Sequence, residues 1–134
     1  MVIEDVAITP PAELTYPRLF AGPDGVSHFG EGRLPFQLTA FAPPAPPVPV
    51  AVTTATRCVF AHGHGGWDGG WHPAPARQFV FVLAGVIEIE VGDGEERRFA
   101  AGAVFLLEDT AGRGHRTRVV GADPALLAFA QLGV

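Results

Sequence analysis

Glycine and proline interrupt this chain so often that long regular elements are not expected. The 134 residues include 17 glycines and 13 prolines, with short runs of apolar or alternating residues between them. Short runs separated by turn-forming residues are typical of β-sandwiches and β-barrels. No segment keeps the i, i+3, i+4, i+7 spacing of an amphipathic helix. The sequence therefore predicts an all-β protein.

The C-terminal half gives the clearest strand pattern. Ala84-Gly85 separates two apolar runs, and Asp93-Gly94 is a tight-turn signal of the β-hairpin type. We predict a meander of six short strands at residues 78–83, 86–91, 97–100, 104–108, 115–120 and 125–132.

The preceding part of the chain is less regular. Residues 25–29 and 36–41 could each supply a strand. Residues 42–49 are rich in proline, which cannot occupy a central strand, so we predict a rigid surface crossover rather than a ligand for a polyproline-binding partner. Residues 61–70 contain so many glycines that we predict a loop there.

Charge and hydropathy exclude several classes of protein. All nine basic residues are arginine and the net charge is −5, so a nucleic-acid partner is not expected. Without lysine, Schiff-base catalysis and a phosphate-binding P-loop are excluded. The longest apolar runs, 79–87 and 99–107, are about half the roughly twenty residues of a membrane-spanning helix. We expect a cytoplasmic protein without a membrane partner.

Two residue types occur once each. Ser27 lies outside any G-x-S-x-G motif, so the signature of a serine hydrolase is missing. Because Cys58 is the single cysteine, the chain can form neither an internal disulfide nor a zinc site of several thiolates. Because its neighbours are apolar, we predict that Cys58 is a small core residue rather than a nucleophile.

Two motifs carry a resemblance to a known family. His72 follows Gly66 by six residues, Gln78 follows His72 by six, and Gly85 completes the pattern. This spacing resembles the first cupin motif, in which H-x-H is followed by E and then by G. The segment from Gly102 to His115 resembles the second cupin motif, although its turn is two residues longer than usual and Glu108 replaces the usual proline.

The resemblance implies a single cupin domain over residues 1–134, folded as a double-stranded β-helix, or jelly-roll barrel, with one interior pocket. Residues 1–57 would supply N-terminal strands and the proline-rich crossover, and residues 58–134 would form the cupin core. In metal-binding cupins the two motifs supply three histidines and one glutamate. Here Ala74 stands at the second histidine position, Gln78 at the glutamate position and Val119 at the asparagine position that often closes the second motif.

The expected metal chemistry depends on what remains of that set. If a divalent transition metal (Fe, Mn, Ni, Cu or Zn) is bound, the resemblance assigns it to His72, His115 and Gln78. The carboxylate of a 2-His-1-carboxylate iron site is missing from these positions. His62 and His64 could rejoin such a site, but we expect them to be exposed loop residues.

Strand alternation predicts which side chains line the pocket. Gln78 pointing inward would bring Val80 and Val82 with it, and His115 would bring Thr117. Trp67 and Trp71 flank the end of the glycine-rich segment and are candidates for stacking on a ligand.

The same alternation predicts two features outside the pocket. The outward face of Phe79, Phe81 and Leu83 is too apolar for water, so N-terminal strands or another subunit must cover it. Because small cupins commonly dimerise through such a face, we expect a homodimer. Arg77 should point away from the pocket into a surface ion pair, whereas Glu108 and Asp109 could either orient His115 or cap the following loop.

Three functions remain open from the sequence. The first is a metal-independent acid–base enzyme of the isomerase, epimerase, cyclase or lyase type, in which His72 or His115 transfers a proton and Gln78 binds a polar group of a small, largely apolar substrate. The second is a non-catalytic module that binds a small molecule. The third is a metal-dependent oxygenase with a non-standard ligand set.

Overall fold

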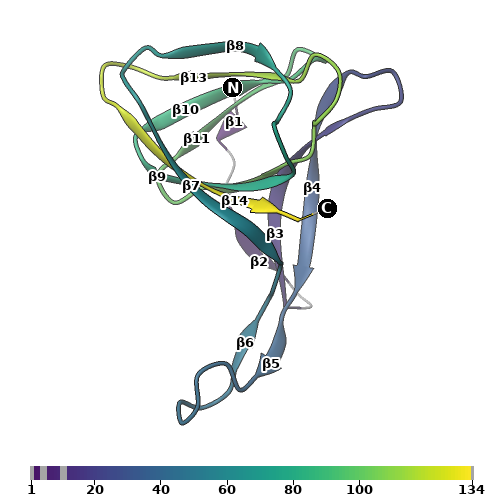
Figure 1. Ribbon diagram of the computed structural model, residues 1–134, viewed down its shortest axis with the longest axis vertical. Helices are drawn as coiled ribbons and strands as arrows, with labels where there is room; N and C mark the ends of the chain where they lie inside the picture. Colours follow the sequence, from purple (N-terminus) through teal and green to yellow (C-terminus); the bar gives the residue numbers. More distant parts are fainter. Residues whose placement is uncertain (1, 4–5, 10–11, 134) are drawn as a thin grey trace.

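A computed structural model describes residues 2–3, 6–9 and 12–133, and in this part of the chain every regular element is a β-strand. Most strands form two sheets that face each other (Figure 1). The five-stranded sheet contains, in spatial order, β1 (Val2–Ile3), β11 (Glu96–Ala100), β10 (Val86–Glu90), β13 (His115–Val119) and β8 (Asp68–His72). The larger sheet contains β2 (Ala7–Thr9), β3 (Glu13–Ala21), β12 (Val104–Leu107), β9 (Gln78–Ala84), β14 (Ala125–Leu132) and β7 (Ala55–Gly63), with β4 (Ser27–Pro35) beside β3.

This arrangement is a jelly-roll type of all-β fold, as the sequence predicts, but the predicted meander is wrong. The six C-terminal strands occur close to the expected residues, yet β9 pairs with β12 and β14, whereas β10 pairs with β11 and β13. Gly85, with φ of 78°, directs the chain from one sheet to the other. A hairpin would have put the apolar faces of β9 and β10 on one sheet instead of opposite each other.

The main core fills the space between the two sheets. Val80 and Val82 from β9 face Ile87 and Ile89 from β10, and all four are buried. Phe99 and Phe105 pack with their ring centroids 4.3 Å apart. Burial of this apolar surface is the main contribution to stability that the sheet-on-sheet arrangement provides.

N-terminal strands cover part of the outward face of β9. Phe79 packs edge-on against Tyr16 of β3, with ring centroids 5.0 Å apart, and Leu106 completes this second cluster. Burial raises the pKa of Tyr16, and the nearby carboxylate of Glu108 adds to the increase. Because β3 also pairs with β12 and places Leu19 in the main core, the N-terminal strands belong to the same folded unit. The division expected at residue 58 falls inside β7.

The glycine-rich segment is not the predicted loop. β7 extends to Gly63 and β8 begins at Asp68, so only residues 64–67 connect them. The glycines allow close approach of the backbone: a Cβ at Gly65 would lie 2.2 Å from the carbonyl oxygen of Ala122.

Cys58 is exposed on β7, which ends the larger sheet in its spatial order, so the prediction of a core position is also wrong. Its apolar neighbours alternate across the strand, and Cys58 lies on the outward side.

The proline-rich residues lie on the surface as predicted, at the tip of a hairpin rather than in a crossover. β5 (Gln37–Thr39) pairs with β6 (Val48–Val50) as a separate two-stranded sheet. Figure 1 shows this hairpin extending away from the two larger sheets. Among the described residues, no helix is long and apolar enough to cross a membrane.

Candidate functional site

The most distinctive polar contact in the protein joins His115 to Asp109. The Nδ1 atom of His115 lies 2.6 Å from Oδ2 of Asp109, and both side chains are buried. His115 begins β13, and Asp109 comes just after the end of β12, so the turn between the strands brings the two together. Of the two roles that the sequence left open, Asp109 has that of orienting His115.

This contact determines which nitrogen of the imidazole carries the proton. A carboxylate only accepts hydrogen bonds, so Nδ1 of His115 donates to Asp109 and Nε2 keeps its lone pair in the neutral ring. Within the described part of the chain, nothing donates to the other oxygen of Asp109, Oδ1, which is also buried. His115 is therefore the side-chain hydrogen-bond partner that the structure gives for this carboxylate.

Glu108 has a separate structural role. Its carboxylate accepts hydrogen bonds of 2.8 Å from Arg18 of β3 and from Arg77. Burial alone would raise the pKa of Glu108, but these two hydrogen bonds outweigh that effect and hold the pKa below its ordinary value. The predicted surface ion pair of Arg77 is confirmed, and its partner is Glu108.

His72 lies directly opposite His115. The two residues are paired in the register of β8 and β13, and their ring centroids are 4.9 Å apart. The Nδ1 atom of His72 lies 2.9 Å from the carbonyl oxygen of Gly70. Because a carbonyl only accepts, Nδ1 carries the proton here too, and Nε2 of His72 is an acceptor.

Both histidines line a cavity of about 480 Å³ between the two sheets. This volume is within the usual range for small-molecule sites. Among the described residues the lining contains histidine but no aspartate, glutamate, lysine or arginine. Most of it is apolar, with contributions from Ile87, Phe105 and Phe129.

Most of the predicted pocket residues do line this cavity. His72, His115, Gln78, Val80, Thr117 and Trp67 are all part of the lining. Val82 points inward with Val80, as predicted, but neither Val82 nor Trp71 is among the lining residues. Val82 is buried deeper in the core, where its backbone bonds to Gly102 and Ala103.

Trp71 points out of the barrel because its neighbour His72 points in. Side chains alternate along a strand, so only one of the two adjacent residues can face the cavity. The ring of Trp71 lies under the guanidinium of Arg113, with 3.9 Å between Cζ and the ring centroid. The tryptophan has a cation–π partner outside the site.

Gln78 is a hydrogen-bond donor for the cavity. Its Oε1 accepts a hydrogen bond of 3.1 Å from Nε2 of Gln131. The amide N–H groups of Gln78, which lines the cavity, are then left for a ligand. His72, His115 and Gln78 therefore offer the cavity two imidazole acceptors and one amide donor, and the lining also includes the polar side chains of His62, Trp67 and Thr117.

Sequence reasoning missed several lining residues. His62, expected as an exposed loop residue, is exposed but lies in β7 and lines the cavity, whereas His64 bonds to the carbonyl oxygen of Gly65. Phe129 and Leu127 also line it from β14. Alternation along residues 125–132 points to these two, but His62 has no comparable signal because the glycines of residues 61–70 predict a loop.

The donor set does not fit the metal centre of metal-binding cupins. Nowhere in residues 2–3, 6–9 and 12–133 do three or more His, Cys, Asp or Glu side chains form a group suited to a metal ion. Ala74 offers no donor side chain, and the amide oxygen of Gln78 is engaged with Gln131. At the motif positions, the Nε2 atoms of His72 and His115 are the donors that remain, which is too few for that metal centre.

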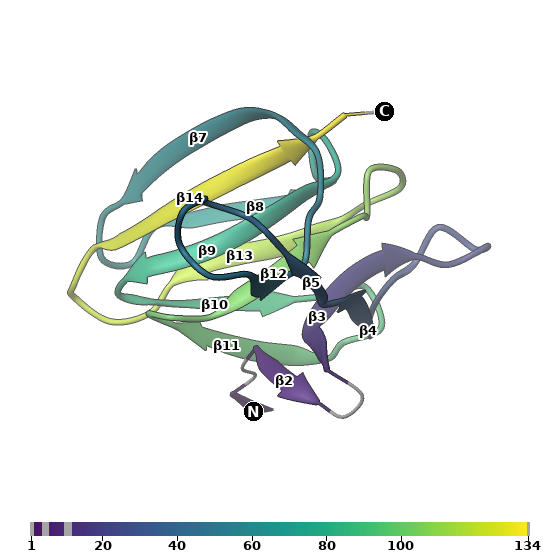
Figure 2. The ribbon, with the colours of Figure 1, turned by 90° about the horizontal axis from the view of Figure 1, so that it is seen from below.

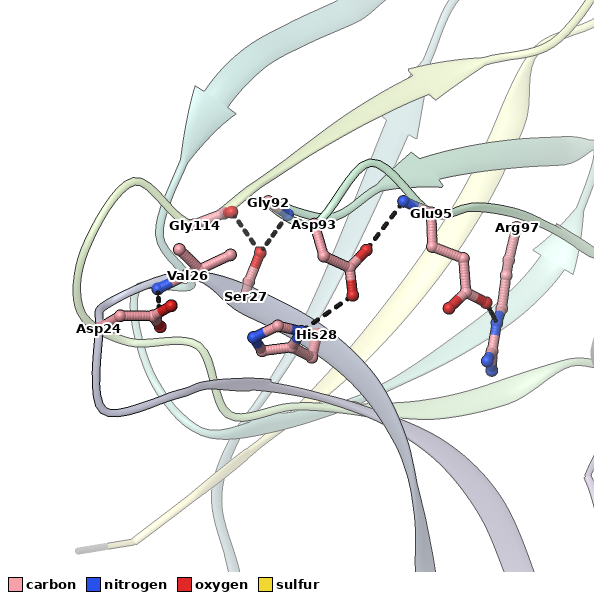
Figure 3. A network of polar contacts seen from close by, with 9 residues as sticks. All are labelled: Asp24, Val26, Ser27, His28, Gly92, Asp93, Glu95, Arg97 and Gly114. Atoms are coloured by element: carbon pink, nitrogen blue, oxygen red, sulfur yellow. Dashed lines mark hydrogen bonds and ion pairs between the residues drawn. The ribbon is translucent and has the colours of Figure 1, made fainter.

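A buried serine supports the turn that carries the site (Figure 3). The hydroxyl of Ser27 donates to the carbonyl oxygen of Gly114 over 2.7 Å and accepts from the N–H of Gly92 over 2.8 Å. Gly114 immediately precedes His115, and a Cβ at Gly114 would lie 2.0 Å from the carbonyl oxygen of His72. The serine and this glycine together fix the start of β13 against β8.

A family model and two solved structures are similar to this chain. No curated protein matches the chain. One similar solved structure is a conserved protein of unknown function from Streptococcus pyogenes, with 22% identity, a TM-score of 0.46, and coverage of 63% of this chain and 72% of that one. Another is NovW, a 4-keto-6-deoxy sugar epimerase of Streptomyces spheroides, with 16% identity, a TM-score of 0.46, and coverage of 100% and 72%. The family model described as "Cupin domain" matches residues 59–130, more than half of the chain, which confirms the resemblance seen in the motifs: this protein belongs to the cupin family.

Proposed function

We propose that this protein is a metal-independent acid–base enzyme of the isomerase, epimerase, cyclase or lyase type. The observation that carries the proposal is the buried pair of Asp109 and His115, with 2.6 Å between Oδ2 and Nδ1, beside a cavity of about 480 Å³. A carboxylate behind an imidazole holds the ring in one orientation and stabilises the cation that forms when the ring takes up a proton.

Four polar residues of the site then have defined tasks. Nε2 of His115 removes a proton from the ligand, and Asp109 stabilises the resulting imidazolium. The N–H groups of Gln78 donate to a carbonyl or hydroxyl oxygen and stabilise negative charge that develops there. His72 faces His115 at a ring distance of 4.9 Å and, when protonated, returns a proton to the ligand.

The lining of the cavity indicates the class of ligand. A phosphate or carboxylate would find no arginine or lysine among the described lining residues, and its desolvation would be uncompensated. An uncharged molecule with an apolar body and one carbonyl or hydroxyl group fits the aromatic and aliphatic walls. We propose a small, neutral, largely apolar carbonyl compound as the substrate.

Proton exchange tests the proposal without knowledge of the natural substrate. A panel of neutral ketones, aldehydes and lactones is incubated with the protein in D₂O, and NMR follows deuterium incorporation next to the carbonyl. We expect exchange in at least one compound, a loss of at least about 100-fold in His115→Gln, and no loss in Trp71→Ala, whose side chain lies outside the cavity.

The same experiment separates the alternatives. A compound that shifts the signals of cavity residues but is neither exchanged nor converted would indicate a binding module and contradict the enzyme proposal. Activity that disappears after chelation and returns with iron or manganese would favour the oxygenase interpretation. Exchange that is unaffected in His115→Gln would show that the buried pair is not the base.

A further inference from the structure

The connection between β7 and β8 places a tryptophan at one end of the barrel. Residues 64–67 join β7 of the larger sheet to β8 of the five-stranded sheet, at the end where β13 continues into β14 (Figure 2). The N–H of Trp67 donates to the carbonyl oxygen of His64 over 3.0 Å, and its carbonyl oxygen accepts from the N–H of Val119 over 2.8 Å. These bonds fix the start of the Trp67 side chain relative to β13.

Two glycines leave the space that this side chain occupies. The Cβ and Cγ atoms of Trp67 lie 3.9 and 4.0 Å from the place of a Cβ at Gly63, which ends β7. The far edge of the indole lies over Gly69 of β8, where a Cβ would be only 2.6 Å from Cη2. That distance is well inside van der Waals contact. The indole therefore spans from β7 to β8, and a side chain at position 69 would displace it.

The same glycine brings the indole next to the two histidines of the cavity. A Cβ at Gly69 would lie 3.3 Å from Cε1 of His72, the carbon between the two ring nitrogens. Trp67 and His72 therefore meet over Gly69, and His72 faces His115 at 4.9 Å between ring centroids. All three of these residues line the cavity of about 480 Å³. A molecule that contacts the indole is thus also close to the groups proposed to transfer protons.

The indole of Trp67 is left partly uncovered by the protein. Trp67 is 40% exposed, whereas Phe105, which lines the same cavity, is 1% exposed. The other tryptophan differs, because the ring of Trp71 already has the guanidinium of Arg113 on it. An uncovered aromatic ring in a ligand-sized cavity is a surface that a bound molecule can bury. Aromatic rings pair in offset-stacked or edge-to-face arrangements, which contribute free energy beyond the burial of area.

We propose that Trp67 is the stacking platform for a planar ring of the substrate, and that Gly69 keeps this platform beside His72. The inference rests on the proposed function, and it narrows the substrate to a neutral compound whose carbonyl group is attached to an aromatic or conjugated ring. A ring stacked on Trp67 holds its carbonyl substituent near the imidazole of His72. A cavity of roughly 150 Å³ is enough to bind benzene, so about 480 Å³ holds such a compound with its substituents.

Two neutral methyl ketones of similar size test the platform. Acetophenone carries a planar aromatic ring, and cyclohexyl methyl ketone carries a puckered saturated one. NMR titration of the isotope-labelled full chain gives the dissociation constant of each ketone from the amide signals of cavity residues. We expect acetophenone to bind about 2- to 10-fold more tightly, which is the factor that aromatic pairing adds beyond area burial. It should shift the indole N–H signal of Trp67 but not that of Trp71, which lies outside the cavity.

Substitutions distinguish stacking from a purely structural role of the tryptophan. Trp67→Phe keeps an aromatic ring and should keep the preference for acetophenone, whereas Trp67→Leu should bring the ratio of the two dissociation constants to about 1. Gly69→Ala should also weaken the preference, because its Cβ displaces the indole. Trp71→Leu is the matched control and should bind both ketones as the wild type does. Circular dichroism checks that each variant is folded.

The outcomes for the platform and for the proposed function are distinguishable. Equal affinities in the wild type, a preference that persists in Trp67→Leu, or no saturable binding of acetophenone would overturn the platform. Deuterium exchange at the methyl group, followed in D₂O with the same ketones, tests proton transfer separately. A preference without exchange would support the platform and count against the enzyme, whereas exchange without a preference would support the enzyme and overturn the platform.

Discussion

The contact between Asp109 and His115 should contribute a larger coupling free energy to the stability of the fold than exposed ion pairs do. The perturbation is a double-mutant cycle of Asp109→Ala, His115→Ala and the double variant. His115→Ala leaves a buried carboxylate without a partner, and Asp109→Ala leaves the buried N–H of His115 without an acceptor. The double variant removes both groups, so it should cost less stability than the sum of the two single changes.

The expected magnitude follows from the geometry. A buried, charge-assisted hydrogen bond of 2.6 Å contributes about 2 kcal/mol net, which is the coupling we expect from the cycle. His115→Ala should be the costlier single change, at about 3 kcal/mol or more, since an unpaired buried charge is more expensive than an unpaired N–H.

The assay is urea unfolding at neutral pH, with the free energy of unfolding taken by linear extrapolation. The chain contains a matched control in His28 and Asp93, which make the same kind of contact at 2.9 Å with both side chains about one-third exposed (Figure 3). That cycle should give less than about 1 kcal/mol, because water and salt screen the pair. A coupling below about 0.5 kcal/mol for Asp109 and His115 would refute the buried pair and the catalytic role built on it.

Three further substitutions and one control, Gly121→Ala, test the residues that support the site by the same unfolding assay. Gly114 has φ of 78°, and a Cβ there would lie 2.0 Å from the carbonyl oxygen of His72, so Gly114→Ala should lower the free energy of unfolding by more than about 3 kcal/mol. Gly121 has φ of 80° but lies in open space, so Gly121→Ala should lower it by only about 1 kcal/mol. Equal losses for the two variants would contradict the close approach at Gly114. Ser27→Ala should cost about 1–3 kcal/mol by leaving a buried carbonyl and N–H unpaired, and a neutral result would mean that this bridge is absent in solution. The lowered pKa of Glu108 means that its ion pairs stabilise the fold above the ordinary carboxyl pKa and lose this effect as the pH falls through the lowered value. Glu108→Gln should therefore be less stable than wild type, by about 1 kcal/mol, at neutral pH but not in strong acid, and a pH-independent difference would contradict the assignment.

Much of the fold could be predicted from the sequence because its signals are local. Alternation and turn residues gave the C-terminal strands within one or two residues, and motif spacing identified the cupin barrel. The inward direction of Gln78, Val80 and Thr117 followed from the two-residue repeat of a strand. These inferences need only the residue order within one element.

The errors have a different origin, which is pairing between distant segments. The partners of β9 are set by which apolar faces meet across the core, and no local signal distinguishes that arrangement from a meander. The glycines of residues 61–70 predict a loop, whereas Gly65 is required by the approach of Ala122 from another part of the chain. Cys58 has apolar neighbours in sequence, but β7 lies at the end of its sheet, so its outward side is exposed.

The position of the carboxylate distinguishes this site from a metal centre. In the metal-binding pattern a glutamate faces the cavity, where its charge attracts a cation directly. Here the corresponding residue is Gln78, and the nearest carboxylate of the site is Asp109, which lies behind the ring of His115. A carboxylate in that place does not line the cavity, but its hydrogen bond with Nδ1 of His115 leaves Nε2 of the imidazole as an acceptor. This arrangement of the two histidines supports the proposed proton transfer to and from a neutral ligand.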